Sequence, residues 1–183
     1  GYFGVASAVP VLLAVLQDGD NDSKLSAANA LQRITAAGLK ETVTMVDEEE
    51  PDLTPGDITG EKAPSDSEPI TATPPRTRDV EQVCTDPARW AAWWQQNAAR
   101  LNASTRWRNG KPFDCGVLID DLADARSDYE ARQLACLELT IRSGQHVPFE
   151  PDGFISKQQR AIAQWQTWWQ TNAAAFQNRC WTF

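Results

Sequence analysis

Few residues in this 183-residue chain could carry catalytic or metal chemistry. It has one histidine, His146, and four cysteines at positions 84, 115, 136 and 180, with no short paired spacing. Zinc and haem sites need clustered His and Cys ligands, and a catalytic histidine needs a nucleophile and an orienting group. No spacing around His146 supplies them, so we predict no enzyme activity and no cofactor. Because each cysteine lies in or beside an apolar helical pattern, we expect reduced, structural thiols.

A stripe of carboxylates is the one candidate cation site. Asp120, Asp124 and Asp128 are spaced i, i+4, i+8, with Asp121 beside them. Such oxygens could in principle hold Mg²⁺ or Ca²⁺. A solvated helix face is the more common meaning of this pattern, and acidic residues near a helix start are also favoured electrostatically. We therefore predict no metal site here.

Arg106, Arg108 and Lys111 form a basic cluster around the dipeptide Asn109-Gly110. Asn-Gly favours a tight turn, and clustered guanidinium and ammonium groups could bind a phosphate or a carboxylate. The alternative is pairing within the chain with Asp114, Asp120 or Asp121. The three basic residues are kept as candidate partner-binding residues, with internal pairing as the more frequent outcome.

The net charge of −8 arises from one segment. Residues 41–80 contain eleven acidic residues against Lys62, Arg76 and Arg78, six of the eleven prolines and no aromatic residue. This composition predicts an acidic linker over residues 43–84. A solvated spacer is one interpretation. The other is an anionic arm that binds a basic partner through acidic residues, namely Asp47, Glu48, Glu49, Glu50 and Asp52. The negative charge disfavours binding to nucleic acid or to anionic lipid.

The segment before this linker, residues 1–42, has the pattern of a helical hairpin. Val9, Leu12, Leu13 and Leu16 share one helix face, and a second stripe runs through Leu25, Ala28, Leu31 and Ile34. Gly19 and Asn21 break the chain between them, and Asp22 or Ser23 is expected to cap the second helix. Such a unit needs a neighbour to bury its faces.

The segment after the linker, residues 85–183, contains an internal duplication. Trp90-x-x-Trp93-Trp94-Gln95-x-Asn97 recurs 75 residues later as Trp165-x-x-Trp168-Trp169-Gln170-x-Asn172. Indoles at helical spacing are usually core residues, and an exposed aromatic binding strip is the alternative. Between the two copies we predict a helix from Gly116 to Asp124. A second is predicted from a Ser127-x-x-Glu130 capping box through Ala131, Leu134, Leu137 and Ile141 to Gly144. The predicted fold is all-α.

The N-terminal motifs resemble a HEAT repeat. The resemblance rests on Ala8-Val9-Pro10-x-Leu12-Leu13-x-x-Leu16-x-Asp18 and Ala27-Ala28-x-Ala30-Leu31-x-x-Ile34. The segment Arg106 to Phe113, the Trp clusters and the Phe149-x-Pro151-x-Gly153-Phe154 turn are similar to bacterial HEAT-like proteins encoded near type VI secretion effectors. The resemblance implies a non-catalytic scaffold that binds proteins, and a cytoplasmic immunity protein or an adaptor for a secreted toxin.

Three functions are therefore compared: a partner-binding HEAT-like module, an enzyme with an unrecognised site, and a structural segment of a larger assembly. The first is favoured, as an immunity protein against a basic, nuclease-type toxin, with an effector-loading adaptor as the alternative. No membrane span or export signal is visible, which predicts a cytoplasmic protein. A long linker would also allow a monomer and a domain-swapped dimer to coexist.

Overall fold

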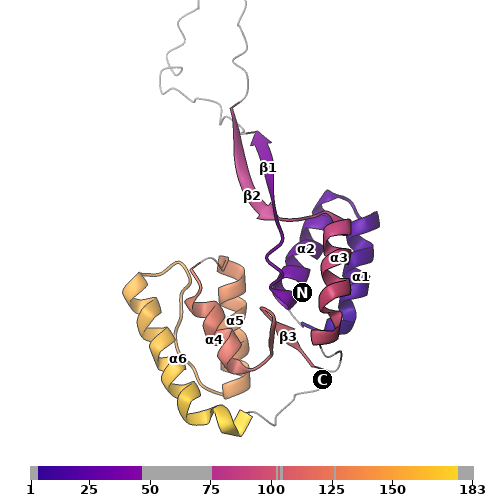
Figure 1. Ribbon diagram of the computed structural model, residues 1–183. Helices are drawn as coiled ribbons and strands as arrows, with labels where there is room; N and C mark the ends of the chain where they lie inside the picture. Colours follow the sequence, from indigo (N-terminus) through magenta and orange to yellow (C-terminus); the bar gives the residue numbers. More distant parts are fainter. Residues whose placement is uncertain (1–3, 47–75, 102, 104, 126, 177–183) are drawn as a thin grey trace, which may run out of the picture.

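The computed structural model describes residues 4–46, 76–101, 103, 105–125 and 127–176. Six α-helices, two short 3-10 helices and two small two-stranded sheets make up these residues. Helices dominate, as predicted, but the fold is not purely α-helical (Figure 1).

The predicted N-terminal helical hairpin is present. A 3-10 helix, η1 (Ala6–Ala8), leads into α1 (Val9–Asp18), and α2 (Asn21–Thr35) follows after a two-residue turn. The cap of α2 is Asp20 rather than Asp22 or Ser23, because the Asp20 carboxylate accepts the Ser23 N–H at 2.8 Å. The two predicted stripes meet in one core except at Leu25, which is half-buried and lies outside it.

The predicted linker over residues 43–84 is wrong at both of its ends. Strand β1 (Lys40–Val46) pairs antiparallel with β2 (Thr77–Val83), with Val43 opposite Val80. We call this pair the ribbon; it projects beyond the helices in Figure 1. β-branched residues such as Thr42, Val43 and Thr44 favour this conformation, but their strand partner lies more than thirty residues away, so no local pattern shows the pairing.

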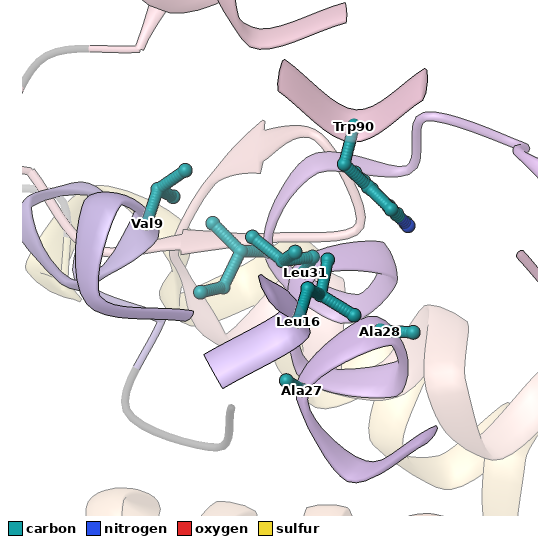
Figure 2. Close-up of a cluster of buried hydrophobic side chains, with 7 residues drawn as sticks. Val9, Leu16, Ala27, Ala28, Leu31 and Trp90 are labelled. Carbon is teal, nitrogen blue, oxygen red and sulfur yellow. The ribbon is translucent and has the colours of Figure 1, made fainter. Parts of the chain in front are cut away.

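Helix α3 (Pro87–Asn97) begins at an Asp-Pro pair, with Pro87 in its first turn and the Asp86 side chain accepting the Ala88 N–H at 2.8 Å. A 3-10 turn, η2 (Ala98–Arg100), ends it. Trp90 of α3 lies in one buried cluster with Leu16 of α1 and Leu31 of α2 (Figure 2). Helix α3 therefore completes the N-terminal unit, and the expected boundary between residues 84 and 85 does not separate the two cores.

The second unit follows a short hairpin of β3 (Trp107–Arg108) and β4 (Lys111–Pro112). Its helices are α4 (Cys115–Ala123), α5 (Tyr129–Ser143) and α6 (Ile155–Phe176). The cap of α5 is Asp128, which accepts the Ala131 N–H at 2.6 Å, rather than the predicted Ser127. A second core gathers residues from all three helices and includes the fully buried Trp165.

The stripe predicted for α5 is buried only at Ala131. The buried residues are Ala131, Ala135 and Leu139, whereas Leu137 is 54% and Ile141 71% exposed. Both stripes have helical spacing and share Ala131, and the one through Ala135 and Leu139 faces α4 because small side chains allow the helices to approach closely.

The duplication seen in the Trp helices extends to both whole units. Helix α2 and its cap Asp20 correspond to α5 and its cap Asp128, and each helix has 15 residues. Both helices end at a left-handed residue, Ala36 in the first unit and Gly144 in the second. In each unit the first helix, α1 or α4, contacts both of the others. The described helices thus form two three-helix units with the same order and the same helix contacts, the first interrupted by the ribbon and the second ending in a longer helix.

Trp90 and Trp165 occupy equivalent positions and are the two fully buried indoles among the described residues. Their neighbours Trp93, Trp94, Trp168 and Trp169 are only half-buried. Each buried indole stacks edge-on against the next tryptophan of its helix, with centroids 6.4 Å apart in the first unit and 5.7 Å in the second. The core interpretation therefore holds fully for one tryptophan of each cluster, and Trp181 lies outside the described residues.

Candidate partner-binding site

Of the three basic candidates, Arg106 lies half-buried against α5. Its guanidinium pairs with both carboxylate oxygens of Glu138 and lies over the Phe113 ring at 3.6 Å from the centroid. Arg142 approaches the same carboxylate from within α5, with Nε donating to Oε1 at 2.8 Å. Burial acts to raise the pKa of Glu138, but the Arg106 and Arg142 guanidinium groups together hold it below its ordinary value.

Arg108 cannot present its side chain to a partner, because only 3% of that side chain is exposed. It forms a buried ion pair with Asp121 of α4, and the Asn109 side chain donates to the other oxygen of that carboxylate. Removing either member of such a pair would leave an uncompensated buried charge. Arg108 is thus a structural residue. It pairs within the chain, which was the alternative interpretation of the basic cluster.

Lys111 lies at the surface and donates to Asp120 of α4 at 2.8 Å. The turn between Arg108 and Lys111 has positive φ at both central residues, 51° at Asn109 and 70° at Gly110, as the Asn-Gly signal predicted. Their backbone N–H groups donate to the carbonyls of Arg33 and Ile34 at the end of α2. The basic cluster therefore joins the two helical units and is not an open anion site.

The ribbon is firmly held at its base. The Glu41 carboxylate accepts hydrogen bonds from Gln82 Nε2 at 3.0 Å and from Thr85 N and Oγ1 at 3.0 and 2.8 Å. Burial acts to raise the pKa of Glu41, but these hydrogen bonds leave it lowered. Arg89 of α3 donates to the Lys40 carbonyl at 3.0 Å. The first helical unit thereby fixes the direction in which the ribbon leaves it.

The far end of the ribbon is exposed. Met45 is 49% and Val46 58% exposed, although both are large apolar residues. The antiparallel register places Val43, Val80 and Met45 on one face. The other face has Val46 at its far end and is otherwise polar, with a Lys40–Glu81 ion pair and a hydrogen bond from Thr44 to Asp79 at 2.7 Å. Within the described residues each strand pairs only with the other, so both outer edges retain unpaired backbone groups.

The acidic candidates follow the exposed end of β1 directly in the sequence. They are Asp47, Glu48, Glu49, Glu50 and Asp52, and all lie outside the described residues. The sequence thus attaches the acidic segment to an exposed apolar ribbon end. The structure brings none of the three basic candidates to this place.

The described cysteines have the properties expected of structural thiols. Cys84 and Cys115 are buried and Cys136 is half-buried, and none of the three forms a disulfide. Burial raises the pKa of Cys115 to about 11, so the reactive thiolate is scarce at neutral pH. Cys180 lies outside the described residues.

Among the described residues, no group of three His, Cys, Asp or Glu side chains is placed to hold a metal ion. Of the predicted carboxylate stripe, Asp120 pairs with Lys111, Asp121 with Arg108, and Asp128 caps α5. No helix in the described part of the chain is both long and apolar enough to span a membrane.

Comparison of the chain with known protein families, with curated proteins and with solved structures found no match.

Proposed function

We propose that this protein is a non-catalytic protein-binding module whose binding arm is the ribbon. The observation that carries the proposal is the exposed end of the ribbon, where Met45 and Val46 project from the two opposite faces of a two-stranded sheet with open edges. An isolated two-stranded ribbon is only marginally stable in water. A partner that covers its apolar face or adds a strand to an edge would stabilise it.

The charge of the chain supports a basic partner. Net charge is −8, and the acidic run begins at the residue after Val46. Clustered acidic side chains accelerate association with a positively charged surface and contribute to specificity. A nuclease-type toxin has such a surface because it binds phosphates. The proposed role is therefore a cytoplasmic immunity protein, and the paired helical units are in keeping with a HEAT-like scaffold.

The test is binding to basic toxins encoded beside the gene for this protein, measured by surface plasmon resonance at several salt concentrations. Reversing Asp47, Glu48, Glu49 and Glu50 to Lys should slow association and weaken affinity by one to two decades, about 1.4 kcal/mol per decade. The wild-type association rate should fall steeply with salt. An unchanged rate at low salt would show that this acidic run takes no part in capture.

A second variant isolates the ribbon end. Met45→Gln with Val46→Thr removes exposed apolar side chains while Thr preserves strand propensity. The matched control is Val11→Asn, because Val11 is 65% exposed on α1, away from the ribbon. The ribbon variant should dissociate faster and the control should not. A toxin activity assay on the complex then separates the two roles, since an immunity protein abolishes activity and an adaptor leaves it.

A further inference from the structure

Strand β1 directs half of its backbone hydrogen-bonding groups away from β2. In an antiparallel ladder, residues that bond to the opposite strand alternate with residues whose N–H and C=O point outward. The Cys84 N–H donates to the Leu39 carbonyl at 3.0 Å, one step before the first pair of the ribbon, and this bond fixes the phase of the alternation. The residues of β1 that point outward are therefore Lys40, Thr42, Thr44 and Val46.

This outer edge of β1 is occupied at its base and open beyond it. Arg89 donates to the Lys40 carbonyl at 3.0 Å, as expected for a carbonyl that points away from β2. In the described part of the chain, no other strand pairs with the backbone groups of Thr42, Thr44 and Val46. These residues present alternating donors and acceptors about 6.8 Å apart from one residue to the next. The chemical group that matches such a pattern is the backbone of another extended chain.

The outer edge of β2 differs from that of β1 in charge. The outward-pointing residues of β2 include Asp79 and Glu81, and charged side chains on an edge strand oppose the addition of a further strand. Residues 42–46 of β1 contain no charged side chain and are rich in Thr and Val, which favour strands. The two edges are therefore unequal, and β1 is the edge that is open to a third strand.

Charge also distinguishes a second copy of this chain from a basic partner. The whole net charge of −8 arises in residues 41–80, a stretch that begins in β1 and ends in β2. Two ribbons paired edge to edge would bring these like charges together, which disfavours self-association. A basic strand is attracted by the same charge.

We propose that the outer edge of β1 binds an extended, basic segment of the protein partner as a third strand, an inference that rests on the proposed function. Thr42, Thr44 and Val46 exchange backbone hydrogen bonds with this segment. Its side chains alternate, with apolar ones beside Val43 and Met45 and basic ones on the opposite face. The third strand stabilises the ribbon, because a two-stranded sheet is only marginally stable in water.

The probe is a nine-residue peptide in which Lys and Val alternate, and fluorescence anisotropy measures its binding to the full chain. Two further peptides are N-methylated, one at two Lys residues and the other at two Val residues. The N–H groups of alternate residues in a strand point to opposite edges, so only one of the two peptides loses the donors that face β1. That peptide should bind at least tenfold more weakly than the other. A peptide with Glu in place of Lys should also bind at least tenfold more weakly than the probe.

The chain itself offers a matched pair of variants, Thr42→Pro on β1 and Thr77→Pro on β2. Both threonines are exposed and both point outward, so each proline removes an edge N–H without removing a ladder hydrogen bond. Thr42→Pro should weaken binding of the probe at least tenfold, and Thr77→Pro should bind it as the wild type does. Circular dichroism and thermal melts check folding. The N-methylated peptides test the wild-type chain and do not depend on either variant.

Four results would overturn the proposal. The first is equal binding of the two N-methylated peptides, and the second is equal binding of the probe by the two proline variants. The third is a wild-type dimer in sedimentation velocity that Thr42→Pro abolishes, because the edge would then bind a second copy. The fourth is stronger binding of the probe after residues 51–73 are replaced by Gly and Ser, because the chain's own segment would then occupy the edge.

The proposed function and this inference fail separately. Met45→Gln with Val46→Thr changes side chains on the ribbon but keeps every backbone group of the β1 edge. A toxin that this double variant releases faster, but that Thr42→Pro binds as the wild type does, contacts the faces of the ribbon; the proposed function then stands and the edge inference is wrong. If neither variant changes toxin binding, the proposed function is wrong, while the N-methylated peptides still decide whether the β1 edge accepts a strand.

Discussion

Trp90 and Trp165 occupy the same position in the two units but differ in one hydrogen bond. The Trp90 indole N–H donates to the Cys84 carbonyl at 2.6 Å, whereas the buried Trp165 indole nitrogen has no partner among the described residues. A buried polar group left without a partner costs about 1–3 kcal/mol. The duplication therefore places a satisfied and an unsatisfied indole in matched surroundings.

Replacing each buried tryptophan by Phe should separate these two cases. Trp90→Phe leaves the Cys84 carbonyl without its donor, while Trp165→Phe removes an unpaired donor. We expect Trp90→Phe to cost more by about 1–3 kcal/mol in urea unfolding experiments. Trp90→Ala and Trp165→Ala should each cost about 3–5 kcal/mol, and Trp93→Ala clearly less because that indole is half-buried. Equal costs for the two Phe variants would contradict this account.

Glu138 predicts a pH dependence of stability. Its pKa is below the ordinary value in the folded chain, so its ion pairs stabilise the fold above the unfolded pKa of about 4.3. That contribution is lost as the pH falls from about 4 through the lowered folded pKa. The stability difference between wild type and Glu138→Gln should therefore be constant near neutral pH and shrink below about pH 4. Denaturant melts across this range measure it, and a difference that grows on acidification would refute the assignment.

At the scale of single residues, the sequence predicted turns and helix caps better than it predicted which side chains pair with each other. The Asn109-Gly110 turn and the Asp86-Pro87 cap follow from local backbone rules and could be predicted. The partner of Arg106 could not, because Glu138 is 32 residues away and reaches it only through the packing of α5. The pairing of Arg108 with Asp121 was one of several combinations that the spacing allowed.

Among the elements, the helices were predictable and the ribbon was not. Periodicity located α1, α2, α4 and α5 within a few residues, because each has a local apolar stripe, and the Trp spacing identified α3 and α6 as helical. The ribbon depends on pairing Lys40–Val46 with Thr77–Val83, a contact that no local pattern reveals. The buried side of α5 was predicted only at Ala131, because two stripes of helical spacing run through that residue. The stripe of α2 that corresponds to the exposed one is polar, which distinguishes the two stripes once the duplication is known; its residues are Ser26, Asn29 and Arg33.

The β3–β4 turn makes a prediction about the joint between the units. Gly110 has a φ of 70°, and a Cβ there would lie 2.8 Å from the Thr35 carbonyl oxygen. Gly144 has a similar φ of 66° but nothing within 4 Å of an added Cβ. Gly144→Ala should therefore cost about 1–2 kcal/mol from backbone strain alone. Gly110→Ala should cost more in thermal melts, because it also displaces the end of α2; a smaller cost would contradict the close packing.

For the whole molecule, exchange of the first hairpin between copies stays a prediction. The first core draws α1, α2 and α3 from one chain, and the ribbon ladder fixes the crossing between them. Exchange would require these contacts to break and form again with a second copy. We expect light scattering to show a monomer in fresh samples and a slowly formed dimer only after concentration. A dimer that persists on dilution to nanomolar concentration would contradict this expectation of a monomer.

The interruption of the first unit by the ribbon also sets an order of folding. Residues 36–86 separate α2 from α3, whereas residues 144–154 separate α5 from α6. Closing the longer loop costs about 1.4 kcal/mol more in chain entropy, which slows that step by about tenfold. The second unit should therefore acquire its structure first, and the first unit should follow when the ladder has formed. Pulsed hydrogen exchange during refolding should show amide protection in α4, α5 and α6 before α1 and α3, and shortening the segment between residues 46 and 77 should bring the two phases together.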